Sequence, residues 1–435
     1  MNKETIYALS TPYGKSAIAV FRVSGPNCID IIKKHTDIKK LNRSQQTHTN
    51  FYIDKKNKKI LDKVVAVYLR SPKSYTGEDM LEISTHGSRA IIKGFIEVFT
   101  KTKLCRLADA GEFTRRGFEN NKFDLLQTEA ISDLINAETE EQKEQAVKQL
   151  DGGLSKKIKY FEDQIKKILA NTEAIIDFSD DEVPKNIEKK IKEQTKNIIK
   201  DINNFIKDDK YGERIRSGFY VTLIGKTNIG KSSLINYLAK RDVSIVTKTP
   251  GTTRDLIEIG FDLWGLPVFF IDTAGIRKSK NNIENIGIKR AIEMGKKSAV
   301  NIVFIEKLSE VEKYNNMFDN NIFVQSKSDI NKKLIKSRKI IKISSKSGYG
   351  IQNMLKKIHI RISRKTPKNS LVSRERHRNI LKECLKTLDK SRKISNIDLV
   401  SEEIRKSLNI ISKITGKTDI NEILDIIFKE FCIGK

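Results

Sequence analysis

The chain has 435 residues, of which 38% are hydrophobic, and its 83 Lys and Arg residues outnumber its 55 Asp and Glu residues by 28. This length predicts two to four domains, and no segment approaches about 18 uncharged apolar residues, so a membrane span is not expected. The N-terminus lacks the features of a signal or transit peptide and the four cysteines form no Cys-x-x-Cys pair, so we expect a reduced, cytoplasmic protein. The basic excess favours a polyanionic partner such as nucleic acid, although compositional drift towards Lys, Ile and Asn explains it equally well.

Residues 1–118 are predicted to form an α+β domain. A helix is expected at 88–100, because its apolar residues recur at helical spacing. Those residues, expected on one face, are Ile91, Ile92, Phe95, Ile96 and Phe99. Strands are expected where short runs are rich in apolar or β-branched side chains, at 5–9, 17–23, 64–69 and 80–83.

Two separate stretches, 119–215 and 366–435, are predicted to be mostly helical. Charged amphipathic segments dominate the first of them, and they are broken at 151–153 and at 180–184. The stretch between the two, 216–365, alternates strand and helix in the manner of a parallel-rich α/β sheet. The helical bundle is therefore predicted to be interrupted in sequence by a nucleotide domain.

Residues 225–232, GKTNIGKS, fit the phosphate-binding pattern G-x-x-x-x-G-K-[ST] in full. They follow an apolar run at 219–224 and precede a stretch with helical spacing, an order of strand, loop and helix that disfavours a plain Gly-rich turn. Backbone N–H groups of such a loop bind phosphate oxygens, Lys231 reaches the β- and γ-phosphates, and Ser232 is placed to bind Mg²⁺. The phosphate-site residues predicted here are Asn228, Ile229, Gly230, Lys231, Ser232 and Ser233.

Two further segments have the composition of GTPase switch regions. Asp272 closes an expected strand and can hold Mg²⁺ through water, and the amide of Gly275 can meet a γ-phosphate. The polar loop at 247–255 supplies Thr253 as an Mg²⁺ ligand, with a modification signal in this Thr-rich stretch as the alternative. The GTP-binding residues predicted in the two segments are Thr247, Lys248, Thr249, Pro250, Gly251, Thr252, Thr253, Asp272, Thr273, Ala274 and Gly275.

The base-recognition sequence, usually Asn-Lys-x-Asp, is Ser326-Lys327-Ser328-Asp329 here. Asp329 can accept two hydrogen bonds from guanine, which adenine cannot donate, and Lys327 can lie along the base plane. Ser326 is shorter than Asn, so we expect a bond to the base or to the phosphate loop to be lost, at a cost of about 0.5–1.5 kcal/mol, with guanine preference retained. Backbone amides of Ser344, Ser345 and Lys346 would complete the base pocket.

The remaining strands of the nucleotide domain are expected at 256–263, 267–271, 301–305, 322–324 and 339–343, the first two as a hairpin around Trp264 and Gly265. The link between 300 and 323 is short for such a domain, which predicts that a helix beside the base is trimmed.

With these motifs placed, the whole chain resembles the bacterial and mitochondrial tRNA modification GTPases of the TrmE/MnmE family. The similarity extends from end to end and includes the Cys-Ile-Gly-Lys terminus. The matching segments are 5–25, 75–82, 111–114, 120–125, 173–178 and 431–435. The resemblance implies a multidomain α/β and α+β fold: an N-terminal α+β folate-binding and dimerisation domain (1–118), a discontinuous helical bundle (119–215 and 366–435) and an inserted Ras-like P-loop G domain (216–365).

The resemblance also implies an activity and its partners. The family forms homodimers, which join an FAD-dependent partner of the GidA/MnmG type in a heterotetramer, with FAD on the partner and not on this chain. Together they add an aminomethyl or carboxymethylaminomethyl group to C5 of the wobble uridine (position 34) of certain tRNAs. The one-carbon unit comes from a tetrahydrofolate derivative (5-formyl or 5,10-methylene form), and the reaction depends on K⁺-activated, Mg²⁺-dependent GTP hydrolysis.

Family roles then fall on particular residues of this sequence. By position, Glu284 matches the glutamate that orients the attacking water, beside the catalytic Lys231. The positions that match K⁺-binding residues are Asn228, Thr247, Thr249 and Thr252, those that match Mg²⁺ ligands are Ser232 and Thr253, and those that match folate contacts are Arg22, Glu82, Lys122 and Lys435. Cys432 is either a nucleophile or a packed thiol.

Two other functions stay open from the residues. One is a degenerate scaffold that dimerises and binds folate or its partner with weak GTP turnover, which intact Lys231, Ser232, Thr253, Asp272 and Glu284 disfavour. The other is a ribosome-assembly GTPase, which the N-terminal 118 residues and the Cys-Ile-Gly-Lys end disfavour.

Overall fold

The computed structural model describes most of the chain in two compact units. One unit comprises Met1–Ser132 with Ser412–Lys435, and the other comprises Asp133–Ile411. The domain boundaries expected near residues 118, 215 and 365 remain predictions. The residues described are 4–39, 44–178, 186–207, 209–240, 244–245, 257–272, 292–330, 334–363, 371–417, 424, 427–428, 431 and 434.

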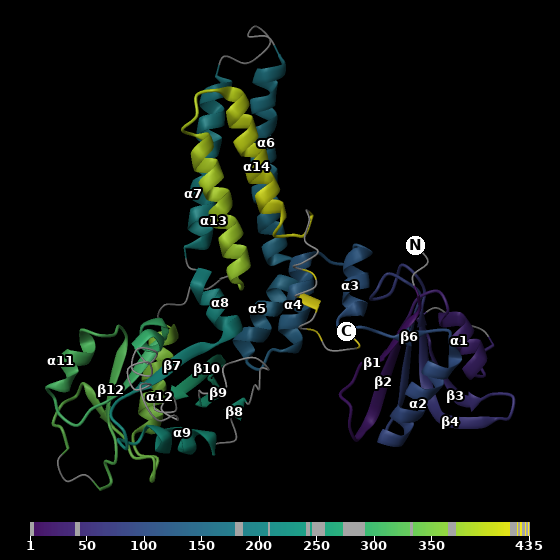
Figure 1. Ribbon diagram of the computed structural model, residues 1–435, viewed down its shortest axis with the longest axis horizontal. Helices are drawn as coiled ribbons and strands as arrows, with labels where there is room; N and C mark the ends of the chain where they lie inside the picture. The colour runs from purple at the N-terminus through teal and green to yellow at the C-terminus, as the bar shows by residue number, and fades with distance from the viewer. Residues whose placement is uncertain are drawn as a thin grey trace, which may run out of the picture. The chain divides into compact units, whose positions relative to one another are not determined.

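A six-stranded sheet of order β3-β4-β5-β2-β1-β6 forms the centre of the N-terminal unit (Figure 1). The strands are β1 (Ile6–Leu9), β2 (Ser16–Ser24), β3 (Gln46–Asp54), β4 (Lys59–Leu69), β5 (Met80–Gly87) and β6 (Arg106–Leu107). The four strands expected from the sequence are confirmed. The polar strand β3 was missed, because its sequence, QTHTNFYID, lacks the regular apolar alternation that indicates a strand.

Helices pack on both faces of this sheet: the first two cover one face, and Phe113 of the third packs with Ile6, Ala8 and Met80 of the other. The helices of the unit are α1 (Cys28–His35), α2 (Arg89–Thr102), α3 (Glu112–Glu119) and α4 (Leu125–Ile135), the last reaching into the second unit. Phe95 and Phe99 of α2 are fully buried against Phe21 and Phe51 of the sheet. The expected apolar face of α2 was too wide, because Ile96 is 37% exposed. The opposite sheet face includes the partly exposed residues of β2 and β5 and is discussed below.

The end of the chain packs back onto the same unit. Leu424, Ile427, Phe428 and Phe431 form an apolar cluster with Leu125 of α4. The carbonyl of Gly434 accepts a hydrogen bond from Ser10 Oγ at 3.1 Å, directly after β1. Residues near the two ends of the sequence thus meet beside the sheet.

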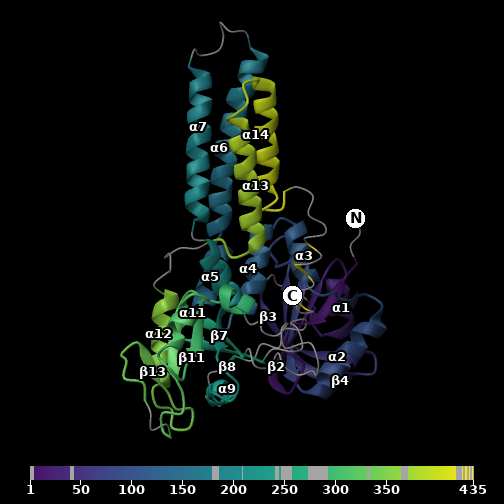
Figure 2. The ribbon, with the colours of Figure 1, turned by 60° about the vertical axis from the view of Figure 1, so that its left-hand side comes forward.

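The second unit contains the discontinuous helical bundle. Its helices are α5 (Glu140–Leu150), α6 (Gly153–Asp177), α7 (Ile187–Ile206), α8 (Asp209–Ser217), α13 (Glu375–Ser391) and α14 (Ile397–Ser412). Figures 1 and 2 both show α6, α7, α13 and α14 side by side, although about 170 residues separate the two pairs. The expected break at 151–153 is confirmed, and the one expected at 180–184 lies outside the described residues.

The nucleotide domain lies between these helices in sequence. Its seven-stranded sheet has the order β13-β12-β11-β7-β10-β9-β8, with β7 in the middle, and only β9 and β8 pair antiparallel to their neighbours. Its strands are β7 (Phe219–Ile224), β8 (Ser244–Ile245), β9 (Ile257–Leu263), β10 (Leu266–Asp272), β11 (Val300–Phe304), β12 (Asn321–Gln325) and β13 (Ile340–Lys342). The expected hairpin and later strands are confirmed.

The helices that accompany this sheet include α9 (Lys231–Ala239), α11 (Glu310–Asn315) and α12 (Ile351–Ser363), and residues 292–297 before β11 are also helical. The link between β11 and β12 holds only the six-residue α11, as the short spacing indicated. The central strands are buried on both faces, and this is why they consist of continuous apolar runs. No helix of the part of the chain that the structure describes is long and apolar enough to cross a membrane.

Candidate functional site

The loop from Gly225 to Gly230 connects the central strand β7 to α9. Gly230 adopts a φ of +112°, and a Cβ there would lie 3.2 Å from Ser326, so glycine allows the two loops to approach each other. Lys231 begins α9 and is 4% exposed. Its Nζ donates hydrogen bonds to the carbonyls of Gly225 at 2.7 Å and Lys226 at 2.6 Å, so the ammonium lies against the loop that would surround a phosphate.

Ser232 and Asp272 come together beside this loop. The Ser232 hydroxyl donates a hydrogen bond to Asp272 Oδ2 at 2.9 Å. The contact follows from the topology, because β10 is parallel to β7 with Asp272 opposite Leu223, and carboxyl ends of parallel strands share one sheet edge. Asp272 is 1% exposed. A hydroxyl and a carboxylate oxygen next to a phosphate loop are the hard donors that Mg²⁺ prefers, so these residues fit that ion.

The base-recognition loop is fastened to the phosphate loop by two side chains. The buried Ser326 hydroxyl donates to the carbonyl of Ile229, and Lys327 Nζ donates to the carbonyl of Asn228 at 3.0 Å. The sequence argument expected Ser326 to lose a bond to the base or to this loop. The bond to the loop is kept, because the short side chain lies directly against Gly230.

Two further segments surround the same place. Ser328 N–H donates to the carbonyl of Ile343, and the side chain of Asp329 is exposed. Ser344 Oγ accepts the backbone N–H of Lys346 at 3.3 Å, which shapes the turn that holds Ser345. The side chain of Ser233 on α9 is exposed. The structure therefore brings all the described nucleotide-site residues to one sheet edge.

Other predicted site residues lie outside the described residues, so their positions stay predictions. They are Thr247, Lys248, Thr249, Pro250, Gly251, Thr252, Thr253, Thr273, Ala274, Gly275, Glu284, Lys435 and the thiol-bearing Cys432.

A second group of predicted residues meets in the N-terminal unit. Arg22 of β2 and Glu82 of β5 are direct neighbours in the antiparallel register, and Arg22 Nε lies 2.8 Å from Glu82 Oε1. The Tyr75 ring lies under the Arg22 guanidinium, with 5.6 Å to its centroid, and 5.5 Å from the Phe123 ring. Lys122 does not join this pair; its Nζ donates to the carbonyl of Pro72 at 2.9 Å, on the loop that carries Tyr75.

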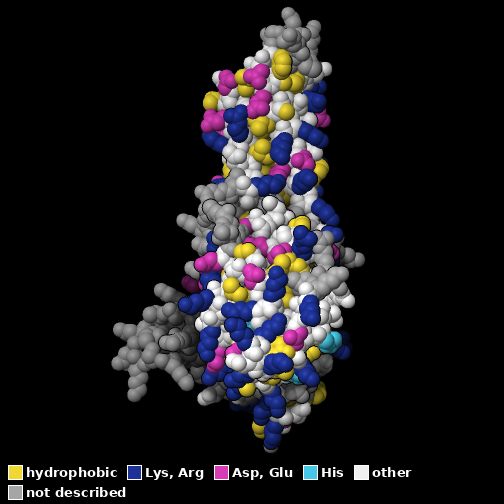
Figure 3. All heavy atoms as spheres, turned by 90° about the vertical axis from the view of Figure 1, so that its right-hand side faces the viewer, with side chains coloured by type: hydrophobic (Ala, Val, Ile, Leu, Met, Phe, Trp, Pro, Cys, Tyr) yellow, Lys and Arg dark blue, Asp and Glu magenta, His cyan; other side chains and the backbone are white. Residues whose placement is uncertain are grey.

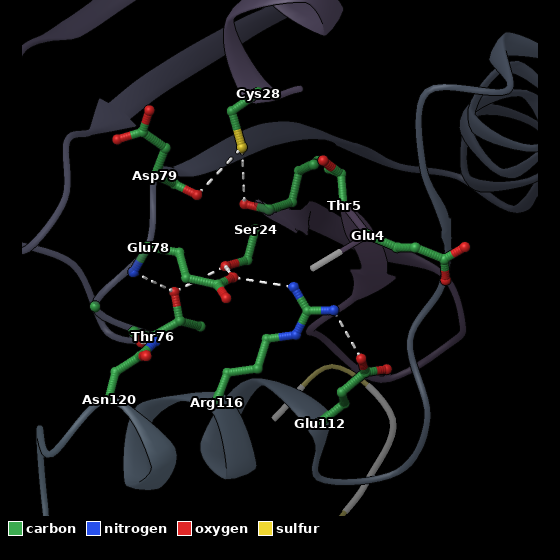
Figure 4. A network of polar contacts seen from close by, with 12 residues as sticks. Glu4, Thr5, Ser24, Cys28, Thr76, Glu78, Asp79, Glu112, Arg116 and Asn120 are labelled. Atoms are coloured by element: carbon green, nitrogen blue, oxygen red, sulfur yellow. Dashed lines mark hydrogen bonds and ion pairs between the residues drawn. The ribbon is translucent and has the colours of Figure 1, made fainter. Parts of the chain in front are cut away.

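Figure 4 shows a buried network that holds this loop in place. Arg116 of α3 is 5% exposed and bonds Glu78 at 3.0 Å and Glu112 at 2.9 Å. Ser24 Oγ donates to Glu78 at 2.9 Å, and Asn120 Nδ2 donates to the carbonyl of Thr76 at 2.7 Å. Loop 72–78 is thereby tied to β2 and to α3.

The electrostatics of this network are dominated by arginine. Burial by itself raises the pKa of the Glu112 carboxyl, but hydrogen bonds from Arg106, from the Asp109 N–H and from Arg116 outweigh it, so the pKa lies below its ordinary value. Sequence reasoning assigned no role to Tyr75, Glu78 or Arg116. The signal was present as opposite charges, in the matched segment 75–82 and just after the matched segment 111–114, whose contact only the fold shows.

The described cysteines do not lie in the surroundings of a reactive or metal-binding thiol. Burial raises the pKa of Cys105 and of Cys384 to about 12, and it also raises the pKa of Cys28. All three are free thiols, which stay protonated near neutral pH. The described residues contain no group of three or more His, Cys, Asp or Glu side chains arranged to hold a metal ion.

The geometry of the nucleotide site defines the class of domain to which it belongs. A phosphate loop between a central parallel strand and a helix, a carboxylate at the end of the neighbouring strand and a Lys-x-Asp loop beside them are the parts of a P-loop GTP-binding domain. This domain interrupts a helical bundle in sequence and follows a separate α+β unit.

Comparison with known proteins identifies the family. Residues 5–122 match the family model described as "GTP-binding protein TrmE N-terminus", and residues 125–432 match "MnmE helical domain". The tRNA modification GTPase MnmE of Rickettsia prowazekii is 39% identical, and that of Pelagibacter ubique is 41% identical, each over 99% of this chain and 100% of the relative. The chain belongs to the MnmE family of tRNA modification GTPases, and it is a GTPase enzyme. This membership disfavours the ribosome-assembly alternative.

Solved structures give a weaker likeness. The G domain of the T. maritima FeoB iron transporter is 23% identical and covers 33% of this chain and 98% of its own, with a TM-score of 0.27. Era in complex with MgGDPNP and nucleotides of 16S ribosomal RNA is 26% identical and covers 32% of this chain and 55% of its own, with a TM-score of 0.26. Scores this low add nothing to the family assignment.

Proposed function

We propose that this chain is a K⁺-dependent GTPase that acts on tRNA together with an FAD-dependent partner of the GidA/MnmG type. The reaction is the addition of an aminomethyl or carboxymethylaminomethyl group to C5 of the wobble uridine (position 34) of certain tRNAs, with the carbon drawn from a tetrahydrofolate derivative. The observation that supports GTP turnover best is the hydrogen bond between Ser232 and Asp272 beside the buried Lys231.

Each described nucleotide-site residue has a distinct task in this proposal. Lys231 neutralises charge on the β- and γ-phosphates. The backbone N–H groups of the loop before it donate hydrogen bonds to the phosphate oxygens. Ser232 would bind Mg²⁺ directly and Asp272 would hold it through water. When bound, the ion would neutralise charge that develops on the transferred phosphoryl group. Asp329 accepts hydrogen bonds from guanine, and Ser326 and Lys327 keep the base loop at a fixed distance from the phosphate loop.

The residues that would complete turnover are carried over from the family by position. Asn228 together with Thr247, Thr249 and Thr252 would hold K⁺, whose charge beside the β–γ bridge stabilises the transition state as a cationic side chain would. Thr253 would add a second Mg²⁺ ligand, and Glu284 would orient the attacking water. Asn228 is the member of this set that the structure describes, and it lies in the phosphate loop next to Ile229.

The proposed folate site rests on the pair of Arg22 and Glu82. A carboxylate such as Glu82 complements the donor edge of an aminopyrimidine, and the Tyr75 ring offers a flat apolar surface beside it. Basic side chains suit the glutamate tail, and Lys122 lies on the adjoining loop. The bond from Ser10 to Gly434 supports a role for Lys435, because Ser10 pairs with Val20, two residues before Arg22.

A homodimer through the N-terminal unit is supported by the sheet face that α1 and α2 leave uncovered. Ile18 on this face is 60% exposed, and Val65 and Ser84 line a hollow of about 880 Å³ beside it. Exposed apolar side chains on a sheet face are typical of interaction surfaces. The same face carries Arg22 and Glu82, so a second copy would lie next to the proposed folate site.

GTP turnover measured in K⁺ and in Na⁺ at matched ionic strength, over a range of protein concentrations, tests this proposal. We expect K⁺ to stimulate turnover selectively, and the rate per chain to rise as nucleotide domains associate. Equal and negligible rates in both salts, with GTP still bound, would contradict the proposal and favour the scaffold with weak turnover.

A further inference from the structure

Positive charge is concentrated in one part of the nucleotide domain. Residues 327–365 contain thirteen Lys or Arg residues and a single acidic residue, Asp329, whereas the whole chain has 83 basic and 55 acidic residues. Uniform drift towards lysine would leave acidic residues here in the same proportion as elsewhere. On the face of the molecule that Figure 3 shows, for comparison, Lys and Arg side chains are interspersed with acidic and hydrophobic ones.

The fold places these basic residues along one margin of the seven-stranded sheet. Lys336, Arg338 and Lys339 are exposed and lead into β13, which is the last strand in the sheet order. Helix α12 packs against β11 and β12, the neighbours of β13, through a buried stripe. That stripe consists of Ile351, Met354, Leu355, Ile358 and Ile362. Lys356 and Arg361 lie off the stripe and are exposed.

We define the basic margin as Lys336, Arg338, Lys339, Lys356 and Arg361. Among the described residues, none of these five side chains forms an ion pair with a carboxylate. Some lysines of the bundle are paired, by contrast: Lys143, Lys390 and Lys406 each lie within 2.8 Å of a Glu oxygen. The charge of the basic margin is therefore uncompensated within the described chain.

An ordinary structural explanation covers only part of this pattern. Lysines beside an edge strand hinder edge-to-edge pairing with another sheet, which accounts for those before β13. It does not account for the outer face of α12, which is not an edge. Tyr349, in the turn between β13 and α12, is 64% exposed and adds an aromatic ring of the kind on which unpaired bases stack.

We propose that the basic margin binds RNA and holds the tRNA substrate against the nucleotide domain. This inference rests on the proposed function, which makes tRNA the substrate. Exposed Lys and Arg side chains pair with backbone phosphates without regard to sequence, so they position an RNA rather than select its bases.

Binding of a tRNA transcript to the full chain, measured over a series of salt concentrations, tests the proposal. The variants are K336Q/R338Q/K339Q and K356Q/R361Q. The matched control is K189Q/K190Q/K192Q, which removes three exposed charges from α7, where Glu188 and Glu193 lie nearby in the same helix. Lys327 and Lys346 are left unchanged because they belong to the candidate base site.

We expect each basic-margin variant to bind tRNA at least about tenfold more weakly than the wild type and the control, with the slope of log affinity against log salt reduced by about one per charge removed. GTP turnover without tRNA should be unchanged in all variants.

Wild-type tRNA affinity in both basic-margin variants would overturn this inference and leave the proposed function standing. An equal loss in the control would also overturn it, since net charge alone would then set affinity. A wild-type chain that binds no tRNA would contradict both proposals.

Discussion

At the scale of single residues, Ser326 changes how the base can be recognised. Its hydroxyl has one proton, which it donates to the carbonyl of Ile229. The N7 and O6 atoms of guanine are acceptors, so Ser326 has no donor left for that edge of the base. Among the side chains of this loop, Asp329 is then the one that discriminates guanine from other bases, through the opposite edge.

We therefore expect the wild-type chain to bind GTP and 7-deaza-GTP with equal affinity. The variant S326N gains two N–H donors, and it should prefer GTP over 7-deaza-GTP by a factor equivalent to about 0.5–1.5 kcal/mol. Competition binding with the two nucleotides measures this preference. The control S326A should bind both more weakly without a preference, and a wild-type preference for GTP would contradict the argument.

Glu82 provides a second test at this scale. Replacing it with Ala in E82A removes the carboxylate proposed to bind the aminopyrimidine, so folate affinity should fall about tenfold or more, in line with the loss of a charged hydrogen bond. Deletion of Lys435 should weaken binding as well. Equilibrium binding of 5-formyltetrahydrofolate measures both. E97A, an exposed carboxylate on α2, is the control, and wild-type affinity in E82A and the deletion would remove the assigned folate site.

At the scale of elements, α5 joins the two points where the chain enters and leaves the nucleotide domain. Three glutamines on one face of α5 donate from Nε2 to backbone carbonyls: Gln142 to Arg216, Gln145 to Gly212 and Gln149 to Leu371, at 3.0–3.1 Å. Their spacing of three and four residues places them on one side of the helix. Asp133 adds ion pairs to Arg216 at 2.8 Å and to Arg374 at 2.7 Å.

The buried Gln149 is the most informative of these residues. In Q149L the carbonyl of Leu371 and the hydroxyl of Ser373 lose their shared donor, so the free energy of unfolding should fall by about 1–3 kcal/mol. Urea denaturation measures this change. K148A, which alters an exposed residue of the same helix, should change it by less than about 0.5 kcal/mol. Equal stability of Q149L and the wild type would show that α5 is not fastened through this contact.

At the scale of the whole molecule, the two candidate sites lie in different units. The described nucleotide-site residues belong to Asp133–Ile411, whereas Arg22, Glu82 and Lys122 belong to the N-terminal unit. Each site is therefore expected to keep its ligand when the other is altered, and only the complete reaction should require both.

Glu284 allows turnover to be separated from binding. In E284A the attacking water loses the group proposed to orient it, so GTP hydrolysis should fall by about 10²-fold or more, while GTP and folate binding remain at wild-type strength. Single-turnover hydrolysis and equilibrium binding measure the two effects. The exposed Glu293 supplies the control E293A, and undiminished hydrolysis in E284A would remove the water-orienting role.

The sequence by itself determined the features that depend on neighbouring residues. The phosphate loop, the apolar strands of the nucleotide sheet and the break before α6 follow from local patterns of glycine, charge and apolar spacing. The same reasoning missed β3, whose polar sequence has no such pattern, and it placed Ile96 on a face where it is exposed.

Only the tertiary structure decided which distant side chains meet. The Arg22–Glu82 pair, the bond from Ser326 to Ile229 and the bond from Ser10 to Gly434 join residues 60, 97 and 424 positions apart. Such contacts depend on strand order, register and the path of the chain, which local hydrogen bonding and periodicity do not specify. For this reason the sequence could only propose residues for the two candidate sites, while the fold determined how the described ones pair.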